Sequence, residues 1–280
     1  MNIGIIGLGL IGGCLGLDFK ALGHRVYGVA RRAATVEAAI ALQIADEAST
    51  DLSLLAPCDV VFICTPIATI VPMVAQLASI LAPKTPITDV GSVKAAIVEA
   101  AAKHWPYFVG GHPMSGKSEA GLAAAEPHIF KARPYVITPI TGTDLQAAQL
   151  VESLATQLGS KIYHCTPEDH DRAVAWISHL PVMISASLIQ AALQESDSKV
   201  LTLAQQLASS GFRDTSRVGG GNPELGLMMA QYNQMEVLRA LKRYQKEIEL
   251  TISQVENSSW DAIAQKLEST SAGRSQFVSE

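Results

Sequence analysis

Short apolar runs alternate with longer segments of helical pattern along the first 165 residues of the chain. Continuous apolar runs bounded by turn residues are typical of strands that are buried on both faces of a sheet. We predict strands at Ile3–Ile6, Arg25–Val29, Asp59–Cys64, Pro86–Val90, Tyr107–Gly110, Pro134–Thr138 and Lys161–Cys165. Between several of them lie alanine-rich helical segments, at Ile70–Leu81, Val93–Lys103 and Leu145–Leu158. This alternation predicts a mostly parallel, doubly wound sheet with helices on both faces.

The strand signals end after Cys165. The next residues combine a capping hydroxyl at Thr166, a proline at the first helical position and early negative charge, which predicts the start of a helix. We predict helices at Glu168–Glu195, Lys199–Ser210, Pro223–Val255 and Trp260–Ser269, with frayed residues beyond them. The fold class is therefore expected to be α/β, with a sheet domain over residues 1–165 and an all-α domain over residues 166–280.

Two of these helices need more apolar contact than a small domain supplies. Ala173–Leu193 is apolar almost all round, but His179, Pro181 and Gln190 favour burial in protein over a membrane span. Pro223–Val255 runs for roughly thirty residues, longer than an ordinary globular helix. We therefore predict a homodimer built on the helical domain, with no membrane association. The first residues have no basic leader and enter a strand directly, so we expect a soluble, cytoplasmic protein.

Composition narrows the classes of partner. The chain has 280 residues, 48% of them hydrophobic, with a formal net charge of −5. No basic tract is longer than the pair Arg31 and Arg32, so we expect no nucleic-acid binding. The four cysteines have no metal-ligand spacing and are expected to be reduced and buried, and no metal site is expected.

A glycine-rich segment closes the first strand and opens the first helix. This context favours a dinucleotide-binding loop over a turn that binds nothing. Gly7 would permit the tight turn, Gly9 would let the backbone approach the pyrophosphate, and Gly12 would allow close packing of helix and strand. The sequence thus predicts a Rossmann-type domain, in which the cofactor lies on Gly7, Leu8, Gly9, Leu10, Ile11 and Gly12.

Two further segments bear on the cofactor. No acidic residue follows the second strand, where NAD enzymes place one for the ribose hydroxyls; Arg31 and Arg32 stand there instead. An arginine pair suits a 2′-phosphate and predicts NADP, although two solvated arginines remain an alternative. Cys64, Thr65 and Pro66 follow another strand and are expected beside the nicotinamide, unless they form an ordinary strand-to-helix turn.

Several motifs together resemble the prephenate/arogenate dehydrogenase family, the cyclohexadienyl dehydrogenases of tyrosine biosynthesis. The resemblance covers residues 1 to about 250. The motifs are the glycine loop, Asp89-Val90-Gly91-Ser92-Val93-Lys94, Gly110-Gly111-His112-Pro113-Met114-Ser115-Gly116, Ser178-His179-Leu180-Pro181 and Gly211-Phe212-Arg213-Asp214-Thr215-Ser216-Arg217. Neither the His-Pro-Met element nor the Asp-x-Gly-Ser-x-Lys element would be specific alone.

The resemblance implies an oxidative decarboxylation of a small-molecule cyclohexadienol, with hydride transfer to the nicotinamide. It assigns His112 as the catalytic histidine in a loop, which accepts the hydroxyl proton, and Ser92 as a hydrogen-bonding partner near that hydroxyl. Arg217 would grip a substrate carboxylate, and His179 would face the substrate. Each has a structural alternative: Ser92 as a helix N-cap, Arg217 in a surface ion pair with Asp214, and His179 as a core histidine. Lys94 is expected to be structural or exposed rather than a base.

The chain departs from the family at two places in the expected substrate pocket. Val182 follows Pro181 where many members have histidine, and Asn222–Gly226 stands where many carry a tryptophan. By analogy we favour arogenate over prephenate, with Asp214, Glu119 and Glu224 as acidic candidates for the substrate ammonium. Nothing after the last long helix is long enough for a regulatory domain, so we expect little allosteric control by tyrosine.

Two other functions remain open from the sequence. A β-hydroxyacid-type dehydrogenase shares the domain order but relies on a lysine in its helical domain, and this chain has none between Lys161 and Lys199. A redox sensor that binds NADP without catalysis would need neither the histidine nor the arginine of the resemblance.

Overall fold

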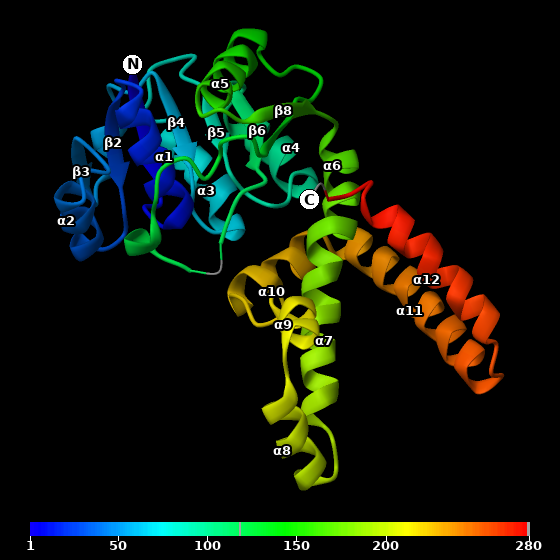
Figure 1. The fold of residues 1–280 in the computed structure, drawn as a ribbon. Coiled ribbons are helices and arrows are strands. Elements are labelled where there is room, and N and C mark those ends of the chain that lie inside the picture. Colours follow the sequence, from blue (N-terminus) through cyan, green and yellow to red (C-terminus); the bar gives the residue numbers. More distant parts are fainter. Residues whose placement is uncertain (118, 279–280) are drawn as a thin grey trace. The chain divides into compact units, whose positions relative to one another are not determined.

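A single sheet of eight strands organises the part of the chain that the computed structural model describes, residues 1–117 and 119–278 (Figure 1). The strands lie in the order β3-β2-β1-β4-β5-β6-β7-β8, and all neighbours are parallel except β6 and β7. The first six strands thus follow the order typical of dinucleotide-binding domains. Their bounds are β1 Asn2–Ile6, β2 Arg25–Val29, β3 Glu47–Ser49, β4 Val60–Ile63, β5 Ile87–Asp89, β6 Phe108–Pro113, β7 Pro134–Thr138 and β8 Lys161–His164.

All seven predicted strands are present, with two differences. β3 was not predicted, because it has three half-buried residues and no apolar pattern. β6 extends to Pro113, because residues Gly110–Pro113 pair with the antiparallel strand β7, and His112 lies opposite Val136. The prediction that His112 lies in a loop is therefore wrong.

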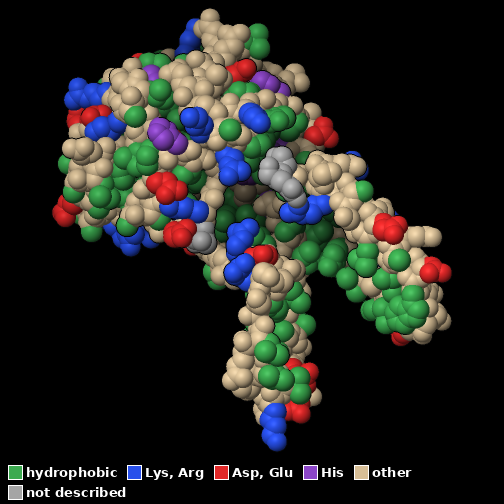
Figure 2. All heavy atoms as spheres, viewed as in Figure 1, with side chains coloured by type: hydrophobic (Ala, Val, Ile, Leu, Met, Phe, Trp, Pro, Cys, Tyr) green, Lys and Arg blue, Asp and Glu red, His purple; other side chains and the backbone are tan. Residues whose placement is uncertain are grey.

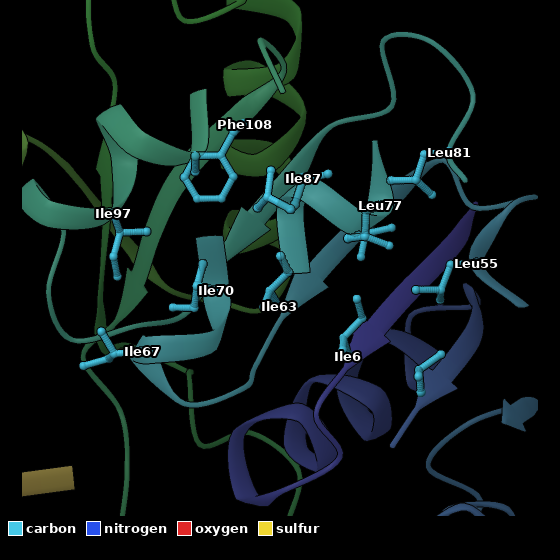
Figure 3. Close-up of a cluster of buried hydrophobic side chains, with 14 of the residues drawn as sticks. Ile6, Leu55, Ile63, Ile67, Ile70, Leu77, Leu81, Ile87, Ile97 and Phe108 are labelled. Carbon is cyan, nitrogen blue, oxygen red and sulfur yellow. The ribbon is translucent and has the colours of Figure 1, made fainter. Parts of the chain in front are cut away.

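The apolar side chains of each central strand alternate between two cores. Ile6, Val61 and Ile63 point to the core under α3 (Ile67–Leu77) and α4 (Ala95–His104), as Figure 3 shows for the labelled side chains. Ile3, Ile5 and Phe62 point to the opposite core, under α1 (Leu10–Ala21). Burial on both faces confirms the doubly wound sheet.

The remaining helices include two that were not predicted, at Ala33–Ala41 and Ser210–Ser216. In the sheet region they are α2 Ala33–Ala41 and α5 Leu145–Gln157, with short 3₁₀ turns at Leu52–Leu55 and Leu122–Ala124. After β8 come α6 Pro167–Val174, a π-helical turn at Ala175–His179, α7 Leu180–Leu193, α8 Ser198–Leu207, α9 Ser210–Ser216 and α10 Pro223–Tyr232. Everything up to Gln234 forms one compact unit, and the residues from Met235 onward form another.

The prediction of one long helix over Pro223–Val255 is wrong, because the helix is interrupted at Asn233. α10 ends at Tyr232 and α11 (Gln234–Glu256) begins after the break, where Asn233 has φ −116° and ψ 36°. The buried Asn233 amide donates to the carbonyl oxygen of Asp171 at 2.7 Å. Asparagine offers the backbone an alternative to the helix through such side-chain hydrogen bonds, and here the partner is distant in the sequence.

The apolar helix after β8 is only partly buried, and its buried residues end at Ser185. His179, Leu180 and Ser185 are buried, whereas residues from Ala186 onward are mostly exposed in the single chain. The segment Pro167–Leu193 has the length and composition of a membrane span, and 28% of its most apolar window is buried. The prediction of burial for Ala173–Leu193 is therefore confirmed only in part, because Trp176 and Ile177 are exposed as well.

The second unit contains α11 beyond Gln234 and α12 (Trp260–Arg274), which run antiparallel (Figure 1). Lys266 on α12 donates to Thr251 Oγ1 on α11 at 2.8 Å. α12 continues to Arg274, so the fraying predicted from Ser269 begins later than expected.

Candidate active site

The carboxyl ends of four neighbouring parallel strands gather the predicted motifs at one edge of the sheet. β1, β4, β5 and β6 run parallel, each paired with the next, so their carboxyl ends lie at the same edge of the sheet. The loops after β1, β4 and β5 therefore lie near the last residues of β6. Ligands of doubly wound sheets bind outside the carboxyl ends of the strands, where the strand order reverses. In this sheet that point lies between β1 and β4.

The loop after β1 has the shape that a pyrophosphate requires. Gly7 has φ +92°, and a Cβ on Gly12 would lie 2.2 Å from the Gly7 carbonyl oxygen, so neither position accepts a side chain. A Cβ on Gly9 would meet no atom within 4 Å, which leaves open space above the loop. No side chain caps α1 at Gly9, so the first N–H groups of the helix face that space. The residues present therefore fit a dinucleotide phosphate.

The two arginines lie next to this loop. The N–H of Gly7 bonds to the carbonyl oxygen of Val29 at 2.9 Å, which joins the end of β2 to the glycine loop. Arg31 and Arg32 stand two and three residues after Val29 and are exposed. Among the described residues neither guanidinium has a hydrogen bond or an ion pair, so both are available to a ligand.

The Cys64–Pro66 turn lies on the other side of the glycine loop. The N–H of Cys64 donates to the carbonyl oxygen of Ile6 at 2.7 Å, and Pro66 begins α3. Cys64 and Thr65 are half-buried and Pro66 is exposed. Burial raises the pKa of the Cys64 thiol, so this cysteine is a neutral wall of the site and not a nucleophile.

A buried ion pair joins the loop after β5 to β6. Lys94 and Asp89 are both 0% exposed and form a salt bridge. Asp89 also accepts from the N–H groups of Gly91 at 2.9 Å and Gly111 at 3.1 Å, and Lys94 Nζ donates to the Gly111 carbonyl oxygen at 2.8 Å. The structural interpretation of Lys94 is confirmed and the exposed one is wrong. The pair fixes the backbone one residue before His112.

His112 contacts a second histidine that the sequence analysis did not single out. His112 Nδ1 lies 2.8 Å from His170 Nε2, and His170 Nδ1 lies 2.7 Å from Asp171 Oδ1. All three side chains are buried. Burial, together with the positive charge that His170, Lys94 and His179 can contribute, holds the pKa of His112 well below its usual range. His112 is therefore a neutral imidazole at neutral pH and can accept a proton.

His179 lies on the π-helical turn between α6 and α7. π-turns often occur at functional sites because the extra residue changes where a side chain points. His179 Nδ1 is 3.1 Å from the Asn233 amide, whereas its Nε2 is buried without a partner among the described residues. Burial lowers the pKa of His179 to about 4, against the opposing effects of Asp171 and of the nearby Ser92 backbone, so this imidazole is also neutral.

Ser92 does not cap a helix, so the N-cap alternative is wrong. α4 begins at Ala95, and its first N–H groups are capped from a distance, because the Asp171 carboxylate accepts from Lys94 N at 2.7 Å and Ala95 N at 2.8 Å. The Ser92 hydroxyl is buried and has no partner in the described part of the chain. An unpartnered buried hydroxyl at this edge is free to bond to a ligand.

Arg217 is exposed at the end of α9, on a segment that packs against α7. The N–H of Gly219 donates to Ser185 Oγ at 2.8 Å. Ser185 follows His179 by six residues, about 9 Å along a helix. Asp214 pairs with Arg213 at 3.0 Å, so the proposed Arg217–Asp214 ion pair is wrong. The structure thus brings His112 and His179 into one buried network and places Arg217 on a neighbouring surface.

His170, Asp171 and Asn233 were not predicted as site residues. The first two directly follow the helix start at Thr166 and stand in none of the motifs that pointed to a site. Asn233 had no signal apart from being a poor helix former within a long helical pattern.

Comparison with known proteins gives a consistent result. The family model of the prephenate dehydrogenase nucleotide-binding domain matches residues 15–164, and the model of the prephenate dehydrogenase dimerization domain matches residues 166–269. The prephenate dehydrogenase of Bacillus subtilis is 32% identical over 259 residues, which cover 90% of this chain and 69% of that protein.

Two solved structures resemble the chain over nearly its whole length. The arogenate dehydrogenase of Synechocystis is 49% identical, with a TM-score of 0.87, covering 99% of this chain and 100% of that one. The prephenate dehydrogenase of A. aeolicus, solved with hydroxyphenyl propionate and NAD+, has a TM-score of 0.93 at 24% identity, covering 99% of this chain and 98% of that one. At that identity the second likeness supports the fold alone.

Proposed function

The chain belongs to the prephenate dehydrogenase family, and from that premise we propose that it converts L-arogenate to L-tyrosine with NADP as the hydride acceptor. The observation that carries the choice of arogenate is the 49% identity to the Synechocystis arogenate dehydrogenase over the whole chain. The identity to the Bacillus subtilis prephenate dehydrogenase is 32%. The second candidate substrate is prephenate, alone or together with arogenate. Each of these alternatives is a nicotinamide-dependent oxidation in tyrosine biosynthesis.

The reaction needs a proton acceptor next to the ring carbon that loses hydride. The neutral imidazole of His112 accepts the proton of the C4 hydroxyl while hydride leaves C4. The bond between the ring and its carboxylate then breaks, carbon dioxide departs, and the bonding electrons complete the aromatic ring. His112 returns its proton to the phenolate oxygen. When bound, the nicotinamide supplies the hydride acceptor, and His112 is again neutral at the end of the cycle.

Three other side chains are assigned to binding. The unpartnered hydroxyl of Ser92 donates toward the C4 oxygen or the nicotinamide, and the open Nε2 of His179 faces the substrate. Arg217 binds a substrate carboxylate, for which a planar guanidinium is suited because it contacts both oxygens at once. The acidic candidates for the arogenate ammonium, Glu119, Asp214 and Glu224, are all exposed.

The preference for NADP rests on Arg31 and Arg32. They follow β2, where the adenosine ribose of a dinucleotide is bound in this type of sheet, and no acidic residue competes with a 2′-phosphate there. Charge-assisted hydrogen bonds from two free guanidinium groups favour the phosphorylated cofactor.

We propose a domain boundary at residue 165, and we assign dimerization to the helical domain, residues 166–280. Large apolar side chains are exposed on α8 and on α11 and α12, and Figure 2 shows hydrophobic side chains gathered on these helices. Exposed apolar patches of this kind mark protein contacts, and the family model that matches this region is that of a dimerization domain. We also propose a cytoplasmic location.

A direct assay tests which substrate the protein prefers. The purified protein is incubated with NADP+ and either arogenate or prephenate, and NADPH absorbance is followed. We expect kcat/KM for arogenate to exceed that for prephenate by about tenfold or more, because an ionic contact to the ammonium contributes about 1.5–3 kcal/mol. Equal values would make the chain a broad cyclohexadienyl dehydrogenase, and no turnover of either would refute the proposal.

A matched pair of variants tests the role of His112. His112→Asn is expected to lower kcat by orders of magnitude with NADP+ affinity unchanged. The control, His104→Asn, changes an exposed histidine at the end of α4 and should leave kcat unchanged. Full activity of His112→Asn would exclude this histidine as the base.

A further inference from the structure

Three buried side chains form a continuous hydrogen-bonded row that ends at His112. Asp171 and His170 are neighbours on α6, and His112 is the penultimate residue of β6. The contacts are Asp171 Oδ1 to His170 Nδ1 at 2.7 Å and His170 Nε2 to His112 Nδ1 at 2.8 Å. The two rings meet edge to face, with an interplanar angle of 70°. Each histidine therefore uses one ring nitrogen to contact the next member of the row.

Asp171 determines where the protons of the row lie. Its carboxylate accepts from Lys94 N at 2.7 Å and Ala95 N at 2.8 Å, at the N-terminus of α4. A carboxylate bound by backbone N–H groups can only accept from His170, so the proton between them is on His170 Nδ1. In a neutral His170, Nε2 is then unprotonated and can only accept.

The contact with His170 determines which nitrogen of His112 is protonated. Because His170 Nε2 accepts, the contact at 2.8 Å requires a proton on His112 Nδ1. A neutral His112 then has an unprotonated Nε2, and that is the nitrogen left to face a ligand. The opposite arrangement, with His170 Nε2 donating, would place the proton on His112 Nε2 and abolish its capacity to accept one.

We propose that His170 and Asp171 are positioning residues that hold His112 in the Nδ1–H tautomer, with Nε2 ready to accept the substrate proton. The inference rests on the proposed function, because it takes His112 as the base. The row also stabilises the imidazolium that forms in the reaction: the positive charge on His112 is linked through His170 to the Asp171 carboxylate. A third group that orients the base is a recurrent arrangement for histidine catalysis.

The tautomer is measured without substrate, by nitrogen-15 NMR of histidine-labelled protein. Comparison with His112→Gln identifies the His112 signals among those of the seven histidines. We expect the Nδ1 of His112 to have the shift of a protonated nitrogen and Nε2 that of an unprotonated one at neutral pH. The reverse pattern, or an even mixture, would overturn the proposal.

Two substitutions at position 170 separate orientation from packing. His170→Phe keeps a buried ring but removes the acceptor, so we expect kcat to fall by about 100-fold or more, with KM for substrate and cofactor within about threefold. In His170→Gln the amide NH₂ can donate to Asp171, which leaves the amide oxygen to accept from His112 Nδ1. This variant should recover kcat to within about tenfold of the native value.

The outcomes distinguish this inference from the proposed function. If the native protein turns over neither arogenate nor prephenate but shows the expected tautomer, the function fails and the row stands as a structural fact. If the native protein is active, and His170→Phe matches His170→Gln in kcat while the NMR pattern of His112 is unchanged, the dyad only packs and the inference fails.

Discussion

Replacing Lys94 with methionine tests the buried ion pair that fixes the backbone before His112. Methionine is close to lysine in length and leaves no large void, so the change mainly removes charge. Asp89 is left 0% exposed without its counter-ion. Removing one partner of a buried pair costs about 3–5 kcal/mol. Asp89 retains two backbone donors, Gly91 N at 2.9 Å and Gly111 N at 3.1 Å, so we expect the lower end, about 3 kcal/mol.

Thermal unfolding of the variants provides the measurement. A loss of about 3 kcal/mol corresponds to a fall of about 6–12 °C in Tm for a chain of this size class. Lys103→Met on the same helix is the control, because Lys103 is 73% exposed in its pair with Glu99 and should change stability by less than about 0.5 kcal/mol.

A double variant makes the reasoning refutable. In Lys94→Met with Asp89→Asn the orphaned charge is gone, so the double variant should be more stable than the sum of the two single losses implies, by about 1 kcal/mol or more. Strict additivity would show that the two side chains are not coupled, and the account of the ion pair would be wrong.

The same substitution should change the pH dependence of catalysis. In the native protein, burial and the neighbours His170, Lys94 and His179 lower the pKa of His112. A base with a lowered pKa stays unprotonated as pH falls, so kcat/KM should hold through the ordinary histidine value of 6.5 and decline only below it. Lys94→Met removes one positive neighbour and should move this decline to higher pH. An unchanged profile would exclude an electrostatic effect of Lys94 on the base.

Three further predictions follow from the cofactor and substrate residues. Gly9→Ala should keep its Tm but lose cofactor affinity, because the added Cβ enters only the open space above the loop. Gly12→Ala should lower the Tm, because its Cβ would lie 2.2 Å from a backbone oxygen, and equal changes in Tm for the two variants would contradict this. The double change of Arg31 and Arg32 to alanine should raise the Kd for NADP+ about tenfold or more and leave that for NAD+ nearly unchanged, as titration calorimetry would reveal. Arg217→Lys should raise the substrate KM about tenfold without affecting cofactor affinity, and an unchanged KM would remove this arginine from the site.

The sheet could be predicted because its signals are local. Each buried strand is a continuous apolar run, and the glycine loop follows the first strand at once. β3 has no such signal, since its three residues are half-buried and pair only with β2. The break at Asn233 was missed for a different reason: its cause is a hydrogen bond to Asp171, 62 residues away in the sequence. A periodic pattern cannot reveal a contact of that kind.

The site residues also fall into those that local motifs predicted and those that only long-range contacts reveal. His112 and Ser92 were predicted because they stand in motifs that resemble a family, and the strand order brings those motifs to one sheet edge. His170 and Asp171 were not predicted, because they follow the helix start at Thr166 and belong to none of those motifs. Their contacts with His112 and with the N-terminus of α4 span 58 and 77 residues, and only the folded chain shows them.

Asp171 connects elements on both sides of the proposed domain boundary at residue 165. Its carboxylate binds the start of α4 and His170, and its carbonyl oxygen accepts from Asn233. A hinge at residue 165 would have to break these short, buried hydrogen bonds and would leave buried polar groups unpaired, at a cost of about 1–3 kcal/mol each. The boundary therefore marks a change of architecture and not a point of movement. These bonds hold His112, its orienting dyad and the N-terminus of α4 together, so we expect any closure around a substrate to come from segments outside this row, such as the exposed one that carries Arg217.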